Sequence, residues 1–283
     1  MKRILAMIMS LAMLLSATEL SFSVNAAENS ENAVITESGA EMASVSSVSS
    51  TATTYFNSIM AKTSDGTYGR QFNTHESGWY TSLEFIETVV RLVYAEAPWW
   101  LADKQATSWV LWNRRQSTES RFASVNTLYD IAVQPGEFAS ITGQSNATGT
   151  ARKPDVTIPS WRNSANYVSM IWAAAIVGGD ATPAGVLPVP TGYTGQLDFR
   201  GYSSFFVENP TYTQNYAFTR DGVPYYHMYN SKTGTASEKR IYHICIPGVG
   251  VYESITAAKN AYYTKYDNID GEKVNIYFSW NNY

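Results

Sequence analysis

The sequence predicts an α+β fold in which a helical region is followed by short strands and loops. Apolar residues recur at helical spacing in three stretches before residue 180. After residue 185 the chain is rich in Gly, Pro, Tyr and β-branched residues, which is typical of short strands joined by loops. Helices first and strands later indicate an α+β domain. The composition, 45% hydrophobic and only 16% charged, is that of a folded chain and not of a disordered one.

The N-terminus has the pattern of a secretory signal peptide. Lys2 and Arg3 form a basic start, residues 4–15 are almost entirely apolar, and small residues follow up to Ala27. The apolar run is shorter than the roughly 20 residues that a membrane-spanning helix needs. We therefore expect residues 1–27 to be removed and the protein to be secreted, to the cell wall or beyond, without stable insertion in a membrane.

Residues 28–53 are rich in Ser, Thr, Ala and Glu and contain no aromatic residue. Such a stretch buries too little apolar surface to offset the entropy lost on ordering, so it is predicted to be a flexible spacer. Residues 54–283 hold nearly all the aromatic residues and are predicted to form a single domain.

The first predicted helix covers about 82–97. Its apolar residues follow a 3.6-residue period, and Thr81 and Glu84 have the spacing of a capping box. Pro98 disfavours helical geometry at the residue before it, so the helix is expected to end there.

Two further helices are predicted at about 104–116 and 161–177. Asp103 and Ser160 are the expected N-terminal caps, and the glycine pair that begins at Gly178 is expected to end the later helix.

Glu96 stands out among the acidic residues. It lies on the flank of the apolar stripe of the first helix, near Val93, and in the last turn, where the helix dipole is negative. Both burial and the dipole should raise the pKa of this carboxyl group, as a general acid requires near neutral pH. Trp99 and Trp100 follow directly and could stack on sugars. A structural glutamate without chemistry is the alternative interpretation. The other charged side chains of this helix are expected on the side opposite the stripe: Glu84, Glu87 and Arg91.

Three motifs resemble those of the SleB-type cell wall hydrolases, the spore-cortex-lytic family. The stretch 85–97 is similar to the family's opening helix, 110–114 is similar to the helix that closes on Asn-Arg, and 133–138 is similar to its Gln-Pro-Gly-x-Phe turn. The predicted helix at 161–177 fits the next family element. The motifs are thus clearest within residues 85–177.

The resemblance implies a helix-dominated, lysozyme-like fold and a peptidoglycan hydrolase, most simply a lytic transglycosylase that cleaves between N-acetylmuramic acid and N-acetylglucosamine. The single catalytic glutamate of the family corresponds to Glu96. The sequence departs from the family where Pro98, Trp99 and Trp100 replace an Arg-Gly-Glu sequence. The motif at the C-terminal end of the family is only partly matched by residues 221–229.

Other candidate residues are expected to bind substrate, although core packing or turn formation would explain several of them equally well. Glu137 is also a candidate second acid. No metal or cofactor is implied, and an acidic chain without a basic block is a poor candidate for nucleic-acid binding. Neither protein partners nor the choice between spore cortex and other walls is indicated. The candidate substrate-binding residues are Tyr94, Trp99, Trp100, Gln134, Glu137, Phe138 and Tyr202.

Two alternative functions stay open. The paired tryptophans and the aromatic C-terminal region are compatible with a glycan-binding protein that has lost activity. The single cysteine, Cys245, could in principle serve a thiol hydrolase with His227 or His243, although a buried structural cysteine is the default expectation.

Overall fold

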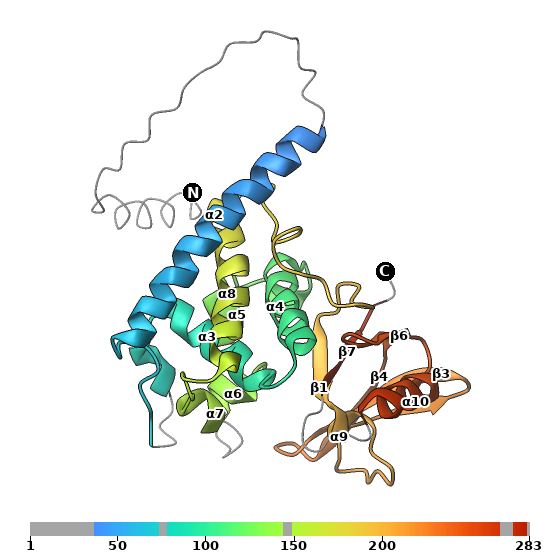
Figure 1. Ribbon diagram of the computed structural model, residues 1–283. Coiled ribbons are helices and arrows are strands. Elements are labelled where there is room, and N and C mark those ends of the chain that lie inside the picture. The colour runs from blue at the N-terminus through green and yellow to red at the C-terminus, as the bar shows by residue number, and fades with distance from the viewer. Residues whose placement is uncertain (1–36, 74–77, 144–148, 267–273, 282–283) are drawn as a thin grey trace, which may run out of the picture. The chain divides into compact units, whose positions relative to one another are not determined.

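The computed structural model describes residues 37–281, apart from 74–77, 144–148 and 267–273. The predicted signal peptide and the first part of the predicted spacer therefore lie outside the described residues. The described chain combines helices with antiparallel strands, and the prediction of an α+β fold is confirmed. Its helical part precedes its strands, as Figure 1 shows.

Several helices and short helical turns make up the first two thirds of the described chain. The longest are α2, α4 and α8, and the candidate acid lies on α3. In chain order these elements are α2 (Glu37–Ser64), the short 3-10 helix η1 (Trp79–Ser82), α3 (Phe85–Glu96), α4 (Leu101–Gln116), η2 (Ser120–Phe122), α5 (Leu128–Ala132), α6 (Ala139–Thr142), α7 (Gly149–Arg152) and α8 (Pro159–Val177).

Helix α2 overturns the predicted spacer for residues 37–53, which form its first half. The helix lies along α8 (Figure 1). Val48 and Ala52 are buried in the same core as the helices that follow. Further along the helix, the Thr63 hydroxyl accepts a hydrogen bond of 3.2 Å from Trp161 Nε1 on α8. A stretch of small residues can therefore be ordered when a few apolar side chains meet a neighbouring helix.

The predicted helix boundaries hold at the C-terminal ends and shift at the N-terminal ends. Helix α3 begins at Phe85, not near 82, because Thr81 belongs to η1, where its hydroxyl donates to Gly78 O at 2.8 Å. Helix α4 begins at Leu101 without a side-chain cap. Helix α8 ends at Val177, and Gly178 caps it with a φ of 67°, which is readily available to glycine.

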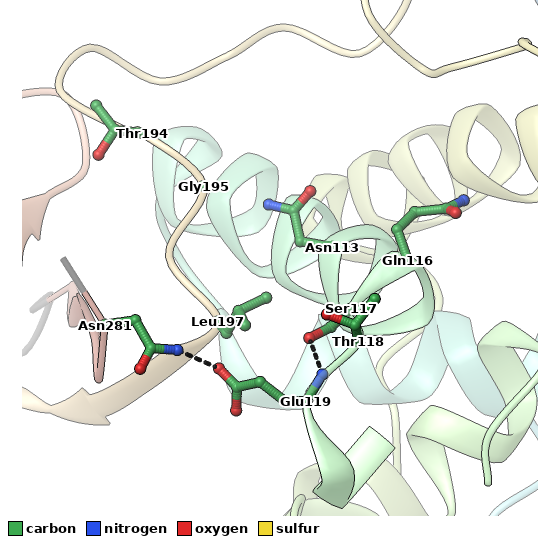
Figure 2. Close-up of a pocket in the computed structure, with 9 residues that line it drawn as sticks. All are labelled: Asn113, Gln116, Ser117, Thr118, Glu119, Thr194, Gly195, Leu197 and Asn281. Carbon is green, nitrogen blue, oxygen red and sulfur yellow. Dashed lines mark hydrogen bonds between the residues drawn. The ribbon is translucent and has the colours of Figure 1, made fainter. Parts of the chain in front are cut away.

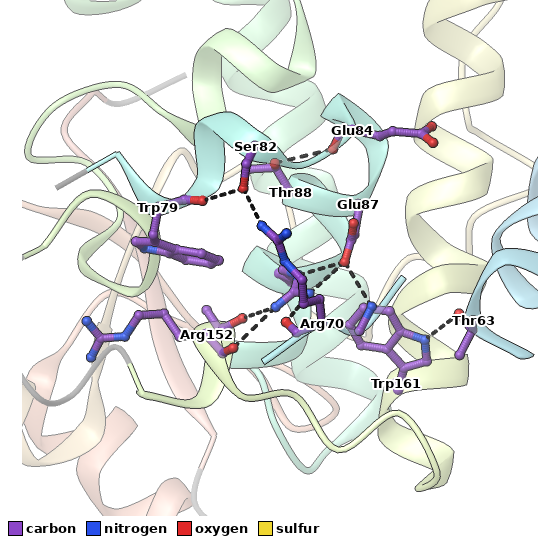
Figure 3. A network of polar contacts seen from close by, with 12 residues as sticks. Thr63, Arg70, Trp79, Ser82, Glu84, Glu87, Thr88, Arg152 and Trp161 are labelled. Carbon is purple, nitrogen blue, oxygen red and sulfur yellow. Dashed lines mark hydrogen bonds and ion pairs between the residues drawn. The ribbon is translucent and has the colours of Figure 1, made fainter. Parts of the chain in front are cut away.

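Helix α3 is buried on nearly every side, and two of the three charged residues predicted opposite its apolar stripe lie inside the protein. Glu87 and Arg91 are buried and pair at 2.6 Å. Glu87 Oε1 also accepts a hydrogen bond of 2.9 Å from the Gly69 amide, and Arg91 donates to the carbonyl oxygens of Arg70 and Ala151. This network ties the segments before and after α3 to its middle (Figure 3). The buried charges are tolerated because each is paired and hydrogen-bonded.

The larger sheet has two differently occupied faces. Its strands run antiparallel in the order β1 (Asp198–Gly201), β7 (Asn275–Ser279), β5 (Tyr242–Ile246) and β6 (Gly250–Tyr252). On β7, Tyr277 packs in the helical core, whereas Ile276 and Phe278 pack in a second core with helix α10 (Ile255–Tyr266). Successive side chains of a strand point to opposite faces, so one strand serves both cores.

The second sheet is a meander of β2 (Tyr216–Arg220), β3 (Val223–Asn230) and β4 (Thr235–Arg240). Asp221 and Gly222 form the two-residue turn between β2 and β3, both with positive φ, which is the pattern of a type I′ hairpin. The short helix α9 (Tyr202–Phe205) precedes this sheet. Of the helices that the structure describes, none is both long and apolar enough to cross a bilayer.

Candidate functional site

Glu96 is the last residue of α3, and its side chain is only partly exposed. Burial raises the pKa of its carboxyl group, and the Ser140 hydroxyl, the Ser140 amide and the positive charges of Arg114 and Arg200 oppose part of that rise. The Ser140 N–H donates to Glu96 Oε1 at 3.3 Å. The raised pKa expected from the sequence is thus confirmed in direction, with burial as the main cause.

The turn at 133–138 places Ser140 beside Glu96. Gly136 has a φ of 84°, so the chain reverses there, and Phe138 then anchors the start of α6 in the core. Ser140 lies in the first turn of α6, where backbone N–H groups have no partner within the helix. One of these N–H groups therefore points at the carboxylate of Glu96.

Arg114 connects the candidate acid to a second carboxylate. Its buried guanidinium pairs with Glu137 at 3.0 Å (Nη1 to Oε2) and with Asp198 at 3.5 Å (Nη2 to Oδ1). Its Nε donates to Leu197 O at 2.7 Å. Because Arg114 also lowers the pKa of Glu96, it stabilises negative charge on both Glu96 and Glu137.

Two cationic residues that the sequence analysis missed complete this polar cluster. Arg121 makes a two-pronged contact with Asp198, at 2.7 and 2.5 Å. Arg200 lies on β1 and acts on the charge of Glu96. Both come from segments without a family-like motif, so their position depends on tertiary structure that no local pattern reveals.

The predicted substrate-binding residues divide into two groups. Glu137 lies in the polar cluster, and Gln134 supports it by donating to Arg121 O at 2.5 Å. Trp99 is 57% exposed and lies three residues after the end of α3. Of these three side chains, Glu137 is linked to Glu96, because both interact with Arg114.

The other predicted binding residues are mainly packing residues. Tyr94 is 5% exposed and packs edge-on against Trp161, and Phe138 is 1% exposed, so neither ring offers a face to a sugar. Trp100 packs edge-on against Tyr266 of the second core. The Tyr202 ring stacks on the buried Tyr262, 5.5 Å between centroids. A helical or turn motif does not show which of its aromatic residues face inward.

A second buried polar group supports Glu96 from the sheet side. The side-chain amide of Asn275 donates to Glu96 O at 2.8 Å and to both carboxylate oxygens of Asp103 at 3.3 and 3.4 Å. Tyr277 donates to Asp103 Oδ1 at 2.6 Å. Asp103, expected to cap α4, is instead the acceptor for two residues of β7. Burial raises its pKa to about 7, against the opposing effects of Tyr277, Asn275 and Lys104.

The loop between α3 and α4 is held by two donors. Lys104 Nζ donates to the carbonyl oxygen of Ala97, and Ser160 Oγ donates to Pro98 O at 2.5 Å. Ser160 thus fixes this loop, although it was expected to cap α8. The backbone immediately after Glu96 is therefore fixed on both sides.

A pocket of about 390 Å³ opens at the C-terminal end of α4 (Figure 2). Glu119 Oε1 accepts a hydrogen bond of 3.2 Å from Asn281, and Glu119 Oε2 one of 2.8 Å from Arg121. The pocket does not contain Glu96. We regard the Glu96 cluster as the candidate site because it holds an acid of raised pKa among cations. The pocket is lined by Asn113, Gln116, Ser117, Thr118, Glu119, Thr194, Gly195, Leu197 and Asn281.

Cys245 does not fit the thiol-hydrolase alternative. Its side chain is fully buried in the helical core, and burial raises the pKa of its thiol well above the usual range. His243 Nδ1 lies 2.7 Å from Glu253 Oε1, and His227 is held on the second sheet. A nucleophilic thiol needs access and a lowered pKa, and Cys245 has neither.

The part of the chain that the structure describes contains no cluster of potential metal ligands. No three His, Cys, Asp or Glu side chains of those residues converge as a metal site would require.

Comparisons with family models, with curated proteins and with solved structures find no match to this chain. The resemblance to SleB-type hydrolases, and the activity that it implies, therefore stay predictions based on the motifs.

Proposed function

We propose that the protein is a secreted peptidoglycan hydrolase that acts as a lytic transglycosylase, with Glu96 as its single catalytic acid. The observation that supports this most directly is the environment of Glu96. A partly buried carboxyl group with a raised pKa ends α3, and Ser140, Arg114 and Arg200 stabilise its ionised form. Such a group keeps its proton to a higher pH than an unperturbed glutamate, and its neighbours accommodate the charge that remains after donation.

The reaction needs one acid because the substrate supplies its own nucleophile. Glu96 protonates the glycosidic oxygen, and the bond from that oxygen to C1 of the muramic acid breaks. The 6-hydroxyl of the same sugar attacks C1, and the Glu96 carboxylate accepts the hydroxyl proton. The products are a 1,6-anhydro end and a free hydroxyl on the leaving sugar. The nucleophile is already in place, so no second encounter is needed.

Trp99 and Glu137 are the substrate contacts that belong to this proposal. Trp99 is 57% exposed, follows Glu96 by three residues in the chain and can stack on a sugar ring. Glu137 shares Arg114 with the Glu96 environment, so it is the first candidate for a second carboxylate if water is the nucleophile. The order of helices followed by strands supports a lysozyme-like arrangement as part of this proposal.

The test is mass spectrometry of fragments released from purified peptidoglycan by residues 28–283. We expect 1,6-anhydromuramic ends, and loss of their release by about 10²–10⁴-fold in Glu96→Gln, which keeps the side-chain shape but has no acidic proton. Glu208→Gln is the matched control, because Glu208 is exposed and pairs only loosely with Lys259, at 3.7 Å. Unchanged lysis by Glu96→Gln would exclude Glu96 as the acid. Reducing muramic ends would replace the transglycosylase with a hydrolase.

A further inference from the structure

The outer face of the second sheet is covered with aromatic side chains. The register pairs Tyr216 with His227 and Phe218 with Tyr225 across β2 and β3. Alternation along β3 places Tyr229 on this face as well. Residues of the opposite face, Ala217 and Tyr226, are buried in the second core. We call the five residues Tyr212, Tyr216, Phe218, Tyr225 and Tyr229 the aromatic face.

Most rings of the aromatic face stand beside one another and remain accessible. Phe218 and Tyr225 stack with 5.7 Å between centroids, and Tyr216 lies 5.8 Å from Phe218. Tyr212 packs edge-on against Tyr229 and is 61% exposed. The other four rings are partly exposed. They contribute little to either core, so packing alone does not explain an aromatic residue at each of these positions.

His227 fixes the arrangement of these rings. It is buried beneath them, stacked on Tyr216 with 4.8 Å between centroids, and its Nε2 lies 2.9 Å from Tyr212 O. Its Nδ1 lies 3.8 Å from Glu238, which in turn pairs with Arg220 at 2.5 Å. The aromatic face is therefore preorganised, so little conformational entropy is lost when a ligand binds.

The charge around this face differs in sign from that of the whole chain. Lys239 lies over Trp280 on the opposite side of the sheet. The remaining charged residues of 212–240 are three Lys or Arg and two Asp or Glu, a net charge of +1, whereas the complete chain carries −4. Arg220 lies over the rings of Phe218 and Tyr225, and Arg240 over that of Tyr242. A ligand with apolar surfaces and carboxylates would complement this combination of rings and cations.

We propose that the aromatic face binds the glycan strand of peptidoglycan, as a contact made by residues separate from the Glu96 cluster. The C–H faces of the sugars would pack on the rings, the tyrosine hydroxyls would hydrogen-bond to N-acetyl groups, and the cations would meet the carboxylates of muramic acid and its peptides. The proposal rests on the proposed function for the identity of the polymer. It adds a site that holds an insoluble wall while Glu96 acts on it.

The test is cosedimentation with purified, protein-free and teichoic acid-free insoluble peptidoglycan. The protein is residues 28–283 carrying Glu96→Gln, so that the wall stays intact. We expect Phe218→Ser with Tyr225→Ser to raise the apparent Kd about tenfold. Tyr212→Ala, a change in an exposed side chain that leaves the strands intact, should raise it about threefold. Phe85→Ala is the matched control, since Phe85 is 59% exposed on α3 and stacks on Tyr129.

A second measurement separates this proposal from the first. With Glu96 intact, the sheet variants should digest insoluble wall more slowly and short soluble glycan fragments at the unchanged rate. If the Tyr212 variant and the double variant cosediment with the wall as well as the parent does, the aromatic face does not bind it. The same conclusion follows if these variants lose activity equally on insoluble wall and on soluble fragments. Intact cosedimentation without any lysis by the unmutated protein would overturn the transglycosylase and leave the binding face standing.

Discussion

At the scale of single residues, the environment of Glu96 shows how opposing effects set the pKa of an acid. Burial favours the protonated form, whereas the Ser140 hydroxyl and amide, Arg114 and Arg200 favour the ionised form. The pKa is therefore raised, and a change in any of these neighbours should shift it. Such balance suits a group that must donate a proton and then accept one in the same reaction.

Arg200→Met tests this balance through the pH dependence of activity. Removing a positive charge near Glu96 raises the pKa of its carboxyl group further, because the ionised form loses a favourable interaction. The alkaline limb of the pH–rate profile should therefore move to higher pH, since Glu96 keeps its proton for longer. Arg162→Met is the control, because Arg162 is exposed on α8 and lies over Phe56. A limb that stays in place, or moves to lower pH, would contradict the assignment of Glu96.

The raised pKa of Asp103 leads to a separate prediction about how stability depends on pH. Its pKa is about 7 in the folded protein and about 3.9 in an unfolded chain. The folded state therefore binds the proton more tightly, so the free energy of unfolding falls as pH rises from about 4 to 7, by up to about 1.4 kcal/mol per pH unit. Asp103→Asn keeps the shape and removes this titration. Urea unfolding of the two proteins should give curves that converge at low pH and diverge toward pH 7, with the variant more stable.

The titration of Lys104 sets the highest pH at which that unfolding experiment is informative. Burial lowers its pKa to about 8, against the opposing charge of Asp103. A lysine whose pKa is lowered by folding adds stability as pH rises from about 8, which would mask the effect of Asp103. Measurements are thus best confined to pH 4–7. Curves that stay parallel over this range would show that Asp103 does not titrate there.

Local sequence identified some residues of the site and missed others for a physical reason. Glu96 was predictable because helical periodicity and the following proline fix its face and its position in the last turn. Asn275 was not, because it reaches Glu96 from 179 residues further along the chain. Tyr94 and Phe138 were predicted as substrate contacts on sequence grounds, but the side of a motif that packs inward depends on elements such as α8 that lie far away in sequence.

At the scale of elements, α2 shows where a compositional argument fails. Residues 37–53 have few large apolar side chains, and the average over the segment predicts a spacer. The buried positions Val48 and Ala52 lie four residues apart, on one side of a helix, and that side faces α8. Order depends on the few residues that meet a partner, not on the mean composition.

Val48→Asp tests whether the first half of α2 is docked on the helical core. Val48 is fully buried, so an unpaired carboxylate there should lower the free energy of unfolding by several kcal/mol. Thr53→Asp adds the same charge at an exposed position of the same helix and should change it by less than about 0.5 kcal/mol. Thermal unfolding of both variants is the measurement. Equal melting temperatures for the two would support the spacer and count against the docked helix.

At the scale of the whole described chain, β7 joins the sheet to the candidate site. Asn275 and Tyr277 contact Asp103 of α4, and Asn275 also holds the last carbonyl of α3, while alternate residues of the same strand fill the second core. The sequence predicted strands after residue 185 but not the order β1-β7-β5-β6. Strand order depends on pairing between distant segments, for which short antiparallel strands carry little local signal.

Asn275→Ala measures this link between the two ends of the chain. The asparagine donates to the Asp103 carboxylate and so favours its ionised form; without it, the pKa of Asp103 should rise further above about 7. Its loss should therefore destabilise the fold more at pH 7, where about half of Asp103 is ionised, than at pH 5, where it is mainly protonated. The lost hydrogen bond to Glu96 O adds about 1 kcal/mol at both pH values.

Chemical denaturation at each pH gives the two free energies of unfolding. In an Asp103→Asn background the difference between pH 7 and pH 5 should disappear. Asn260→Ala, on the exposed side of α10, should show no such difference in either background. A cost for Asn275→Ala that is the same at both pH values would mean that the asparagine holds α3 alone and that Asp103 takes no part in the link.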